Sequence, residues 1–453
     1  PGEWIVSGPH FYVATPFNKT PNEGCKHNQD YSSLDLTNIP DDYLPRTIYV
    51  PACSAVEYRE RTPTWNGKPV TAFYRYANRR MIAPTGERTL VPAILPPVAA
   101  NVDLVFCIVF RSLVQLVEFA ASAASLPVDF FVKSSGKGDA RNDLLIQLPF
   151  LTEETASFAR PRALRLNCLT THYADLWHEV ATKDIANDGF AKQDPRLPSW
   201  KHLSTKWKRD SALRTPYERR QALVELDALA ALSLGLTVEQ LLLIYRVQFP
   251  VLQQYERETF YDQRGKIVFT TNRGLPGVGV TRKEWEQIWH AQAGDKLPAF
   301  AKDAGGAFVP PFDSCDREAD MAQAYRHFQV RLRTVSVDDL PSVIPTVPDT
   351  DAAALFILAL VYVSDGTITL TDLARAFALR ARPSLLNGVA PESLKREVGH
   401  WLSTVGSRTV STGLLSSTLS VLVDRGGVCQ GTNGDGRATV STSSRTPAEE
   451  KID

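Results

Sequence analysis

The stretch from Thr215 to Phe249, "TPYERRQALVELDALAALSLGLTVEQLLLIYRVQF", constrains the fold more than any other part of the chain. Thr215 is an N-cap residue, Pro216 suits a first helical turn, and Glu218 completes a capping box. Gly235 and Thr237 interrupt the apolar spacing, because glycine ends helices and threonine begins them. The stretch therefore predicts two consecutive helices.

The first third of the chain has a different pattern. Short β-branched and aromatic runs alternate with Pro, Gly and Asn, as in strands. One segment, "SLVQLVEFAASAAS" (112–125), instead has the apolar spacing of a helix. We therefore predict a mixed α/β domain over residues 1–151, with strands in "GPHFYVATPF", "RTIYVPA", "TLVPAILPP", "VDLVFCIVF" and "VDFFVKSS".

The remaining segments divide by composition. Residues 152–333 have mostly helical spacing, and the Pro-, Val- and Asp-rich segment 334–351 is typical of a linker. Residues 352–445 contain four helical patterns and then "GVCQGTNGDGRATVSTS", which predicts a hairpin. This order resembles a winged helix, and the polar tail 446–453 is expected to be disordered. The predicted fold class is α+β.

Composition limits the classes of function. The chain has 453 residues, and 50 basic residues balance 50 acidic ones, so any nucleic-acid-binding face must be local. Its six cysteines lie far apart without a CxxC pair, which favours a reduced cytosolic protein without structural zinc. No apolar run reaches the roughly 18 residues of a membrane span. Because the chain opens "PGEWIV", without Met, we expect it to be part of a larger polypeptide.

The sequence offers no catalytic, cofactor-binding or metal-ligating set of residues. There is no P-loop, HExxH or GxSxG motif. Gly136 and Gly138 follow an apolar run as the glycines of a cofactor loop would, but no clear helix or acidic partner comes after them, so a surface turn is the alternative. In "VPPF" (309–312), Val309 cannot accept a hydrogen bond from an adenine amino group.

Two stretches combine cations with aromatic rings. In "YRYANRRMIAPTGERTLVPAILPP", arginine side chains lie beside Tyr74 and Tyr76, and guanidinium groups suit phosphates and guanine edges. Alternatively, the tyrosines pack in the core and the arginines pair with glutamates such as Glu87. The second stretch, 196–220, has eight Lys or Arg against two acids, with Trp200 and Trp207 among them. It predicts either a phosphate-binding surface or a solvated helical linker.

Several segments together resemble one family. They include "GPHFYVATPFNKTPN", "LDLTNIPDDYLPRTIYVPA", "FYRYANRRMIAPTGERTLVPAILPP", "VKSSGKGDARNDLLIQLPF" and the run from "RRQALVELDALAA" to "GKIVF". They are similar to large bacterial adenine-N6 DNA methyltransferases of restriction and phage-defence systems, of the type IIG and DISARM kind. The resemblance covers about residues 8–270 and places them in and around the target-recognition domain.

This resemblance implies that the chain is the DNA-recognition part of such an enzyme. It would position double-stranded DNA in the cytoplasm for a catalytic domain on the same polypeptide or a partner chain, with other defence-system subunits as further candidate partners. The family's cofactor loop and Asn-Pro-Pro-Tyr/Phe motif are missing here, so S-adenosylmethionine is expected only for the parent enzyme. The residues expected to contact DNA are Lys19, Arg46, Arg75, Arg79, Arg80, Arg88, Lys137, Lys201, Lys206, Lys208 and Arg209.

A second hypothesis comes from another class of function. The chain could be a non-catalytic scaffold subunit of a defence complex that docks a helicase or nuclease through its helical and winged-helix parts. Zero net charge favours this hypothesis. Clustering of Arg75, Arg79, Arg88 and the segment 201–209 on one face would favour DNA recognition instead.

Overall fold

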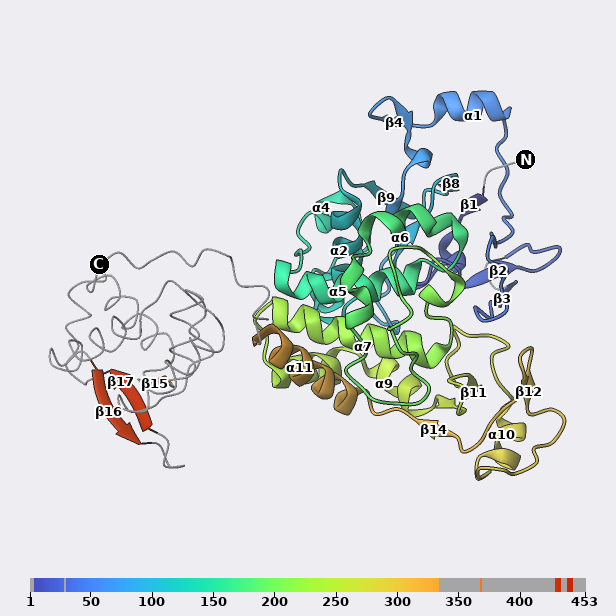
Figure 1. Ribbon diagram of the computed structural model, residues 1–453. Helices are drawn as coiled ribbons and strands as arrows, with labels where there is room; N and C mark the ends of the chain where they lie inside the picture. Colours follow the sequence, from blue (N-terminus) through green and yellow to red (C-terminus); the bar gives the residue numbers. More distant parts are fainter. Residues whose placement is uncertain (1–3, 28–29, 334–366, 369–427, 433–437, 443–453) are drawn as a thin grey trace. The chain divides into compact units, whose positions relative to one another are not determined.

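The structure is a computed structural model that describes residues 4–27, 30–333, 367–368, 428–432 and 438–442 (Figure 1). The chain divides into two compact units, Pro1–Leu332 and Arg333–Asp453. In the second unit, β15 (Thr367–Ile368) and β16 (Val428–Thr432) both pair antiparallel with β17 (Ala438–Thr442). The strands β16 and β17 match the predicted hairpin. The helices of the expected winged helix, the linker and the tail lie outside the described residues.

The helices of the described residues begin in the first unit, and α11 ends at Arg333, directly after its boundary. They are α1 (Ala55–Arg61), α2 (Leu113–Ala123), α3 (Leu126–Ser134), α4 (Asn142–Leu145), α5 (Glu153–Asn167), α6 (Ala174–Val180), α7 (Pro216–Ser233), α8 (Val238–Gln248), α9 (Pro250–Arg257), α10 (Arg282–Ile288) and α11 (Arg317–Arg333).

The strands of this unit are short and form several small sheets. They are β1 (Trp4–Val6), β2 (Lys19–Pro21), β3 (Tyr31–Ser33), β4 (Thr64–Trp65), β5 (Lys68–Pro69), β6 (Arg75–Arg79), β7 (Pro92–Leu95), β8 (Ala99–Asn101), β9 (Val105–Val109), β10 (Phe260–Tyr261), β11 (Ile267–Phe269), β12 (Lys302–Asp303), β13 (Gly306–Ala307) and β14 (Asp313–Ser314). The pairing orders of the two three-stranded sheets are β7-β6-β9 and β11-β10-β14.

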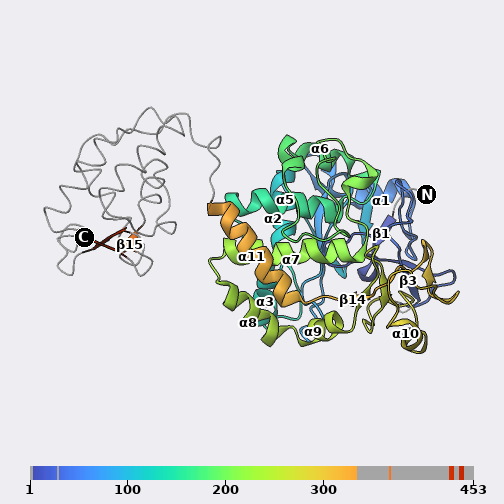
Figure 2. The same ribbon diagram turned by 60° about the horizontal axis from the view of Figure 1, so that its bottom comes forward.

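Helical layers lie against the β7-β6-β9 sheet. Helix α2 packs on β6 and β7, α5 packs on α2, and α7 packs on α5. Figure 1 shows α2, α5 and α7 in this succession, and in both views α11 lies beside α7, to which it is joined by ion pairs (Figures 1 and 2). Helices and small, mostly antiparallel sheets together confirm the α+β fold class.

One hydrophobic core extends through most of this unit. It contains residues from Trp4 to Phe328, including the fully buried rings of Tyr76, Tyr173 and Trp177. The Tyr173 hydroxyl donates to the carbonyl of Ile94 at 2.8 Å, across the boundary predicted at residue 151. The segments 4–151 and 152–332 therefore share an interior.

Helix α7 begins and ends where the sequence predicts. The Thr215 hydroxyl accepts from the backbone N–H of Glu218 at 3.3 Å, and the Glu218 carboxylate accepts from the Thr215 N–H at 3.2 Å. Gly235 follows the helix with a φ of +69°, a left-handed conformation that glycine adopts without strain. The Thr237 hydroxyl then caps α8 by accepting from the N–H of Gln240.

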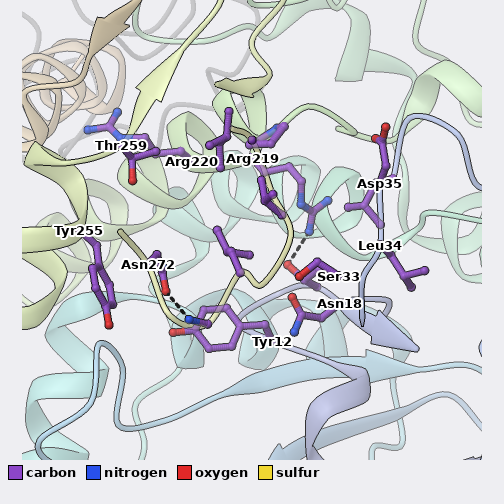
Figure 3. A pocket seen from close by; sticks show the side chains of 18 of the residues that line it. Tyr12, Asn18, Ser33, Leu34, Asp35, Arg219, Arg220, Tyr255, Thr259 and Asn272 are labelled. Atoms are coloured by element: carbon purple, nitrogen blue, oxygen red, sulfur yellow. Dashed lines mark hydrogen bonds between the residues drawn. The ribbon is translucent and has the colours of Figure 1, made fainter. Parts of the chain in front are cut away.

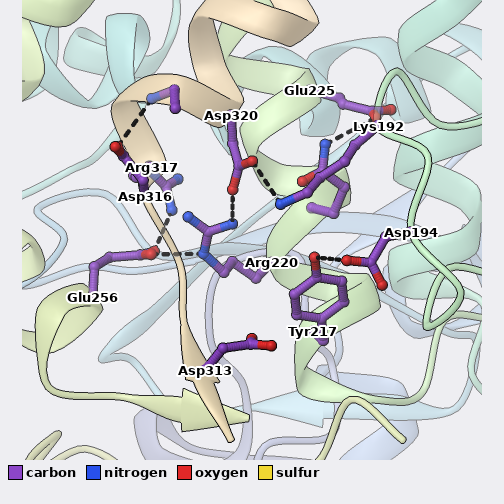
Figure 4. A network of polar contacts seen from close by, with 12 residues as sticks. Lys192, Asp194, Tyr217, Arg220, Glu225, Glu256, Asp313, Asp316, Arg317 and Asp320 are labelled. Carbon is purple, nitrogen blue, oxygen red and sulfur yellow. Dashed lines mark hydrogen bonds and ion pairs between the residues drawn. The ribbon is translucent and has the colours of Figure 1, made fainter. Parts of the chain in front are cut away.

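Helix α7 also buries charged side chains, which its sequence pattern does not reveal. Arg162 of α5 donates to Glu225 at 2.6 Å, and Arg317 of α11 donates to Asp227 at 2.8 Å. Figure 4 shows Arg220 between Glu256 and Asp320, with oxygens at 2.6 and 2.7 Å from its guanidinium nitrogens. These ion pairs join α7 to α5, α9 and α11.

Three strand predictions in the first 151 residues are wrong. "VDFFVKSS" lies in helix α3, because Pro127 suits its first turn and Asp129 turns inward to accept from Arg88 at 2.5 Å. "RTIYVPA" forms no strand. In "GPHFYVATPF" a 3-10 helix (Gly8–His10) and a bridge between Tyr12 and Thr15 replace the expected strand. A short apolar run is compatible with either a helix or a strand, so its tertiary environment determines which of the two it forms.

The remaining helix and strand predictions from this region agree with the structure. The segment 112–125 contains α2, "TLVPAILPP" contains β7, and "VDLVFCIVF" contains β9. Among the described residues, no single helix is long and apolar enough to cross a membrane. The bent pair α2 and α3, with an angle of 71° between them, meets that test only together, and both helices are largely buried.

We expect the buried ion pairs of α7 to be essential for stability. Glu225 is fully buried and accepts from Arg162, from the Ala191 N–H at 2.7 Å and from Gln221 at 3.2 Å. Glu225→Ala should lower the free energy of unfolding by about 3–5 kcal/mol. It removes one of the two carboxylates that neutralise the buried Arg162 guanidinium, leaving only Asp188 at 2.7 Å, and it takes the acceptor from the Ala191 N–H. Urea denaturation followed by circular dichroism measures this change.

The matched control is Glu179→Ala, which removes an exposed glutamate of α6. It should change the free energy of unfolding by no more than about 0.5 kcal/mol. Equal effects of the two substitutions would show that the buried pair does not stabilise the fold.

Candidate nucleic-acid interface and a cationic cavity

The structure places Arg75 and Arg88 in the interior. Arg75 lies on β6, is 2% exposed, and donates to the Ala99 carbonyl and to Asn101 at 3.4 Å. Arg88 is 6% exposed and bonds Asp129 and, at 2.7 Å, the Ala124 carbonyl. Both were expected to contact DNA, but their guanidinium groups are buried and bind internal acceptors, so neither lies on the surface.

Arg79 and Lys19 lie together at a cavity. The Arg79 guanidinium donates to the carbonyls of Gly8 at 2.8 Å and Phe11 at 2.7 Å, and lies over the Tyr12 ring. Burial, and then repulsion by Arg79, lowers the pKa of Lys19. Arg75 and Arg79 both belong to strand β6, in which the odd-numbered residues lie on one face.

The remaining arginines and Lys137 are found at the surface or in exposed pairs. Arg80 pairs with Asp103, and Lys137 pairs with Asp143. Arg46 is exposed. Arg209 pairs with Asp41 and donates to the carbonyls of Ile39 and Thr37, so it ties its loop to the segment 37–41.

The two tryptophans of the basic stretch anchor it to the core. Trp200 is 2% exposed, and the guanidinium groups of Arg165 and Arg162 lie 4.7 and 4.9 Å from its ring centre. The indole N–H of Trp207 donates to the Cys168 carbonyl at 2.8 Å. Trp200 therefore cannot stack on a nucleic-acid base, and the two rings instead fix the loop between them.

Three lysines project from this anchored loop, which we call the lysine loop (residues 200–208). Lys201, Lys206 and Lys208 are all exposed. Among the described residues, none of the three ammonium groups has a carboxylate within ion-pair distance. The structure thus brings these three predicted residues together on one loop, but Arg75 and Arg88 do not share a surface with them.

A cavity of about 550 Å³ lies elsewhere in the same unit. It is lined by side chains from the β2–β3 region, the start of α7, α9 and the glycine-rich loop 272–279. Figure 3 shows Tyr255, Asn272 and Tyr12 on one side and Leu34 and Asp35 on the other. Nine basic side chains line it, namely Lys19, Arg79, Arg88, Arg214, Arg219, Arg220, Lys266, Lys302 and Arg317, against four acidic ones.

Two of these arginines are satisfied by neutral oxygens instead of carboxylates. Arg219 donates to the carbonyls of Leu166, Leu213 and Ala14 and to the Thr15 hydroxyl, at 2.8–3.0 Å. Arg214 donates to the carbonyls of Arg209, Leu36 and Leu169. Burial lowers the pKa of Arg219 to about 9 and that of Arg214 to about 10. Their hydrogen bonds are filled, but their charges are not neutralised by a paired acid.

Arg214 and Arg219 lie in the basic stretch 196–220, whose sequence does not distinguish them from its other cations. Their position at the start of α7 could have indicated a role in the interior. Side chains at this position face the core segments that precede the helix. The acids of the cavity were also missed. Glu87 accepts from the Tyr12 hydroxyl at 3.0 Å and from the Asn272 amide at 3.1 Å, on the same oxygen.

Two features that the sequence raised, metal ligands and a glycine loop for a cofactor, can be compared with the described residues. In the described part of the chain, no three His, Cys, Asp or Glu side chains gather as metal ligands. Gly136 and Gly138 follow helix α3 and precede the four-residue helix α4, so they do not form a strand–turn–helix cofactor loop. In the loop 309–312, the Phe312 ring packs against Trp285 at 5.8 Å between centres.

None of the protein-family models, curated proteins or solved structures compared with this chain matches it.

We expect Glu87 to make stability depend on pH. Burial raises the pKa of Glu87 above its ordinary value. A raised carboxyl pKa favours folding at low pH, and this contribution is lost as pH rises through the folded-state pKa. Glu87→Gln keeps an acceptor for Tyr12 and Asn272 without the charge. Its melting temperature relative to wild type should therefore increase between about pH 4 and pH 7.

Thermal unfolding at several pH values measures this difference. Glu57→Gln, on the exposed helix α1, provides the control and should show no such trend. A constant difference between Glu87→Gln and wild type across the pH range would mean that Glu87 is not desolvated in the folded protein.

Proposed function

We propose that this chain is the DNA-recognition part of an adenine-N6 DNA methyltransferase of a bacterial restriction or phage-defence system. The observation that carries the proposal is the lysine loop. Exposed lysines without paired acids attract phosphates and release counterions when they bind them. The buried ring of Trp200 and the anchored indole of Trp207 hold the loop in place, so less entropy is lost when DNA binds.

Each part of the chain has a different place in this proposal. Phosphate contacts fix the position of a protein on a duplex, and base contacts read its sequence. The lysine loop supplies contacts of the first kind, and the exposed Arg46 is available for either. Methylation and S-adenosylmethionine belong to a catalytic domain outside this chain, with which this part acts on double-stranded DNA in the cytoplasm.

One feature favours the alternative, a scaffold subunit that docks other defence proteins. The arm formed by residues 48–69 buries no side chain of its helix α1. Its Val50 is 83% exposed and Val56 is 64% exposed, and Figure 1 shows α1 and β4 standing clear of the helical layers. Exposed apolar side chains in one segment are typical of protein–protein contacts.

We expect the lysine loop to determine the salt dependence of DNA binding. In a full-chain protein with Lys201, Lys206 and Lys208 all replaced by Ala, binding to duplexes of any sequence should weaken. The slope of log K against log salt should fall by up to about three units, because up to three phosphate contacts are lost. Fluorescence anisotropy at four salt concentrations measures both quantities.

The control replaces three other exposed lysines, Lys183, Lys283 and Lys296, by Ala, which changes net charge equally. If both triple variants reduce the slope alike, the effect comes from net charge and not from the loop. If neither changes it, the loop does not contact DNA, and pull-down with an Ala variant of Val50 and Val56 tests the scaffold hypothesis.

A further inference from the structure

The cationic cavity is separate from the lysine loop. Neither Lys206 nor Lys208 nor Lys201 lines it. Its volume of about 550 Å³ lies within the range of small-molecule sites, which is roughly 300–1,000 Å³. The cavity therefore requires an explanation of its own, whether or not the chain binds DNA.

The charges around the cavity do not cancel locally. Lys266 pairs with Asp35 and Asp303, at 2.7 and 3.2 Å, and Arg220 pairs with Glu256. Those acids are therefore occupied. Arg79 and Arg219 have only carbonyl or hydroxyl acceptors among the described residues. The excess charge at the cavity is positive.

Lys19 is the group best placed to bind an anion there. It is half-buried at the cavity wall, and none of the described residues accepts a hydrogen bond from its ammonium group. The neighbouring Arg79 guanidinium repels it. Two like charges held together in a partly desolvated site oppose folding, and an anion between them would remove that repulsion. Ammonium and guanidinium groups both form strong hydrogen bonds with phosphate oxygens.

The rest of the wall suits an aromatic ring system. Tyr12 and Tyr255 face the cavity on one side (Figure 3), and apolar side chains such as Leu34, Leu223 and Val278 line it as well. Apolar and aromatic walls with a few placed polar groups are typical of sites for planar ligands. The Asn272 side chain, beside Tyr12, adds an amide that can bond the edge of a base.

We infer that this cavity binds a small phosphate-bearing ligand of the nucleotide class. Lys19 and Arg79 hold the phosphate, and the aromatic and apolar wall covers the base. The positive lining disfavours cationic ligands. This inference is independent of the proposed function, because different residues carry it.

Isothermal titration calorimetry of the full chain with adenosine 5′-monophosphate tests the inference. Adenosine and inorganic phosphate serve as separate probes for the two halves of the ligand. Lys19→Ala should weaken binding of the nucleotide about tenfold, as loss of one charge-assisted hydrogen bond does. Glu87→Gln should strengthen it, because a negative charge leaves the cavity wall.

Lys26→Ala is the matched control. Lys26 is exposed on the connection between β2 and β3, and it does not line the cavity. It should bind the nucleotide as wild type does, and so should the triple alanine variant of the lysine loop. Melting temperatures show whether each variant is folded.

Two results would overturn the inference. One is no detectable binding of adenosine, guanosine, cytidine or uridine 5′-monophosphate to the wild-type chain at millimolar concentration. The other is equal nucleotide affinity of folded Lys19→Ala and Lys26→Ala. Neither result would affect the DNA-binding proposal, which depends on the salt slope of the lysine-loop variant.

Discussion

The buried ion pairs on α7 organise the first unit of this protein. Glu225, Asp227 and Arg220 lie on one helix and bind partners from α5, α9 and α11. Asp227 also accepts from the Leu126 N–H at 2.7 Å, which ties α3 to the same helix. A buried charge left unpaired costs several kcal/mol, so these helices pack in a single arrangement that satisfies every pair.

Arginine has two different roles in this structure. Some guanidinium groups neutralise buried acids, as Arg162 and Arg317 do. Others, such as Arg214 and Arg219, join chain segments by donating to backbone carbonyls, because a planar group with five donors can reach several acceptors at once. In the second role the guanidinium groups donate hydrogen bonds to carbonyls, but no carboxylate of the described residues neutralises their positive charge. The cationic cavity is a consequence of this way of joining segments.

The two candidate binding surfaces differ in the ligand that each suits. The three lysines of the lysine loop are exposed. Their ammonium groups are on flexible side chains and act as point charges toward a phosphate backbone. The cavity is lined by basic side chains together with aromatic and apolar ones, and its size suits one small molecule.

Local patterns in the sequence were sufficient to predict α2, α7, α8, β7, β9 and the strands of the C-terminal hairpin. Capping boxes and helical spacing act within a few residues, so they can be read directly. The sequence also identified the lysine loop as a basic stretch. It could not show that Arg75 and Arg88 are buried while Lys201, Lys206 and Lys208 remain exposed. The sequence does not show whether a cationic side chain contacts water, a backbone carbonyl or a carboxylate. Packing between segments that are distant in the sequence determines which of these contacts forms.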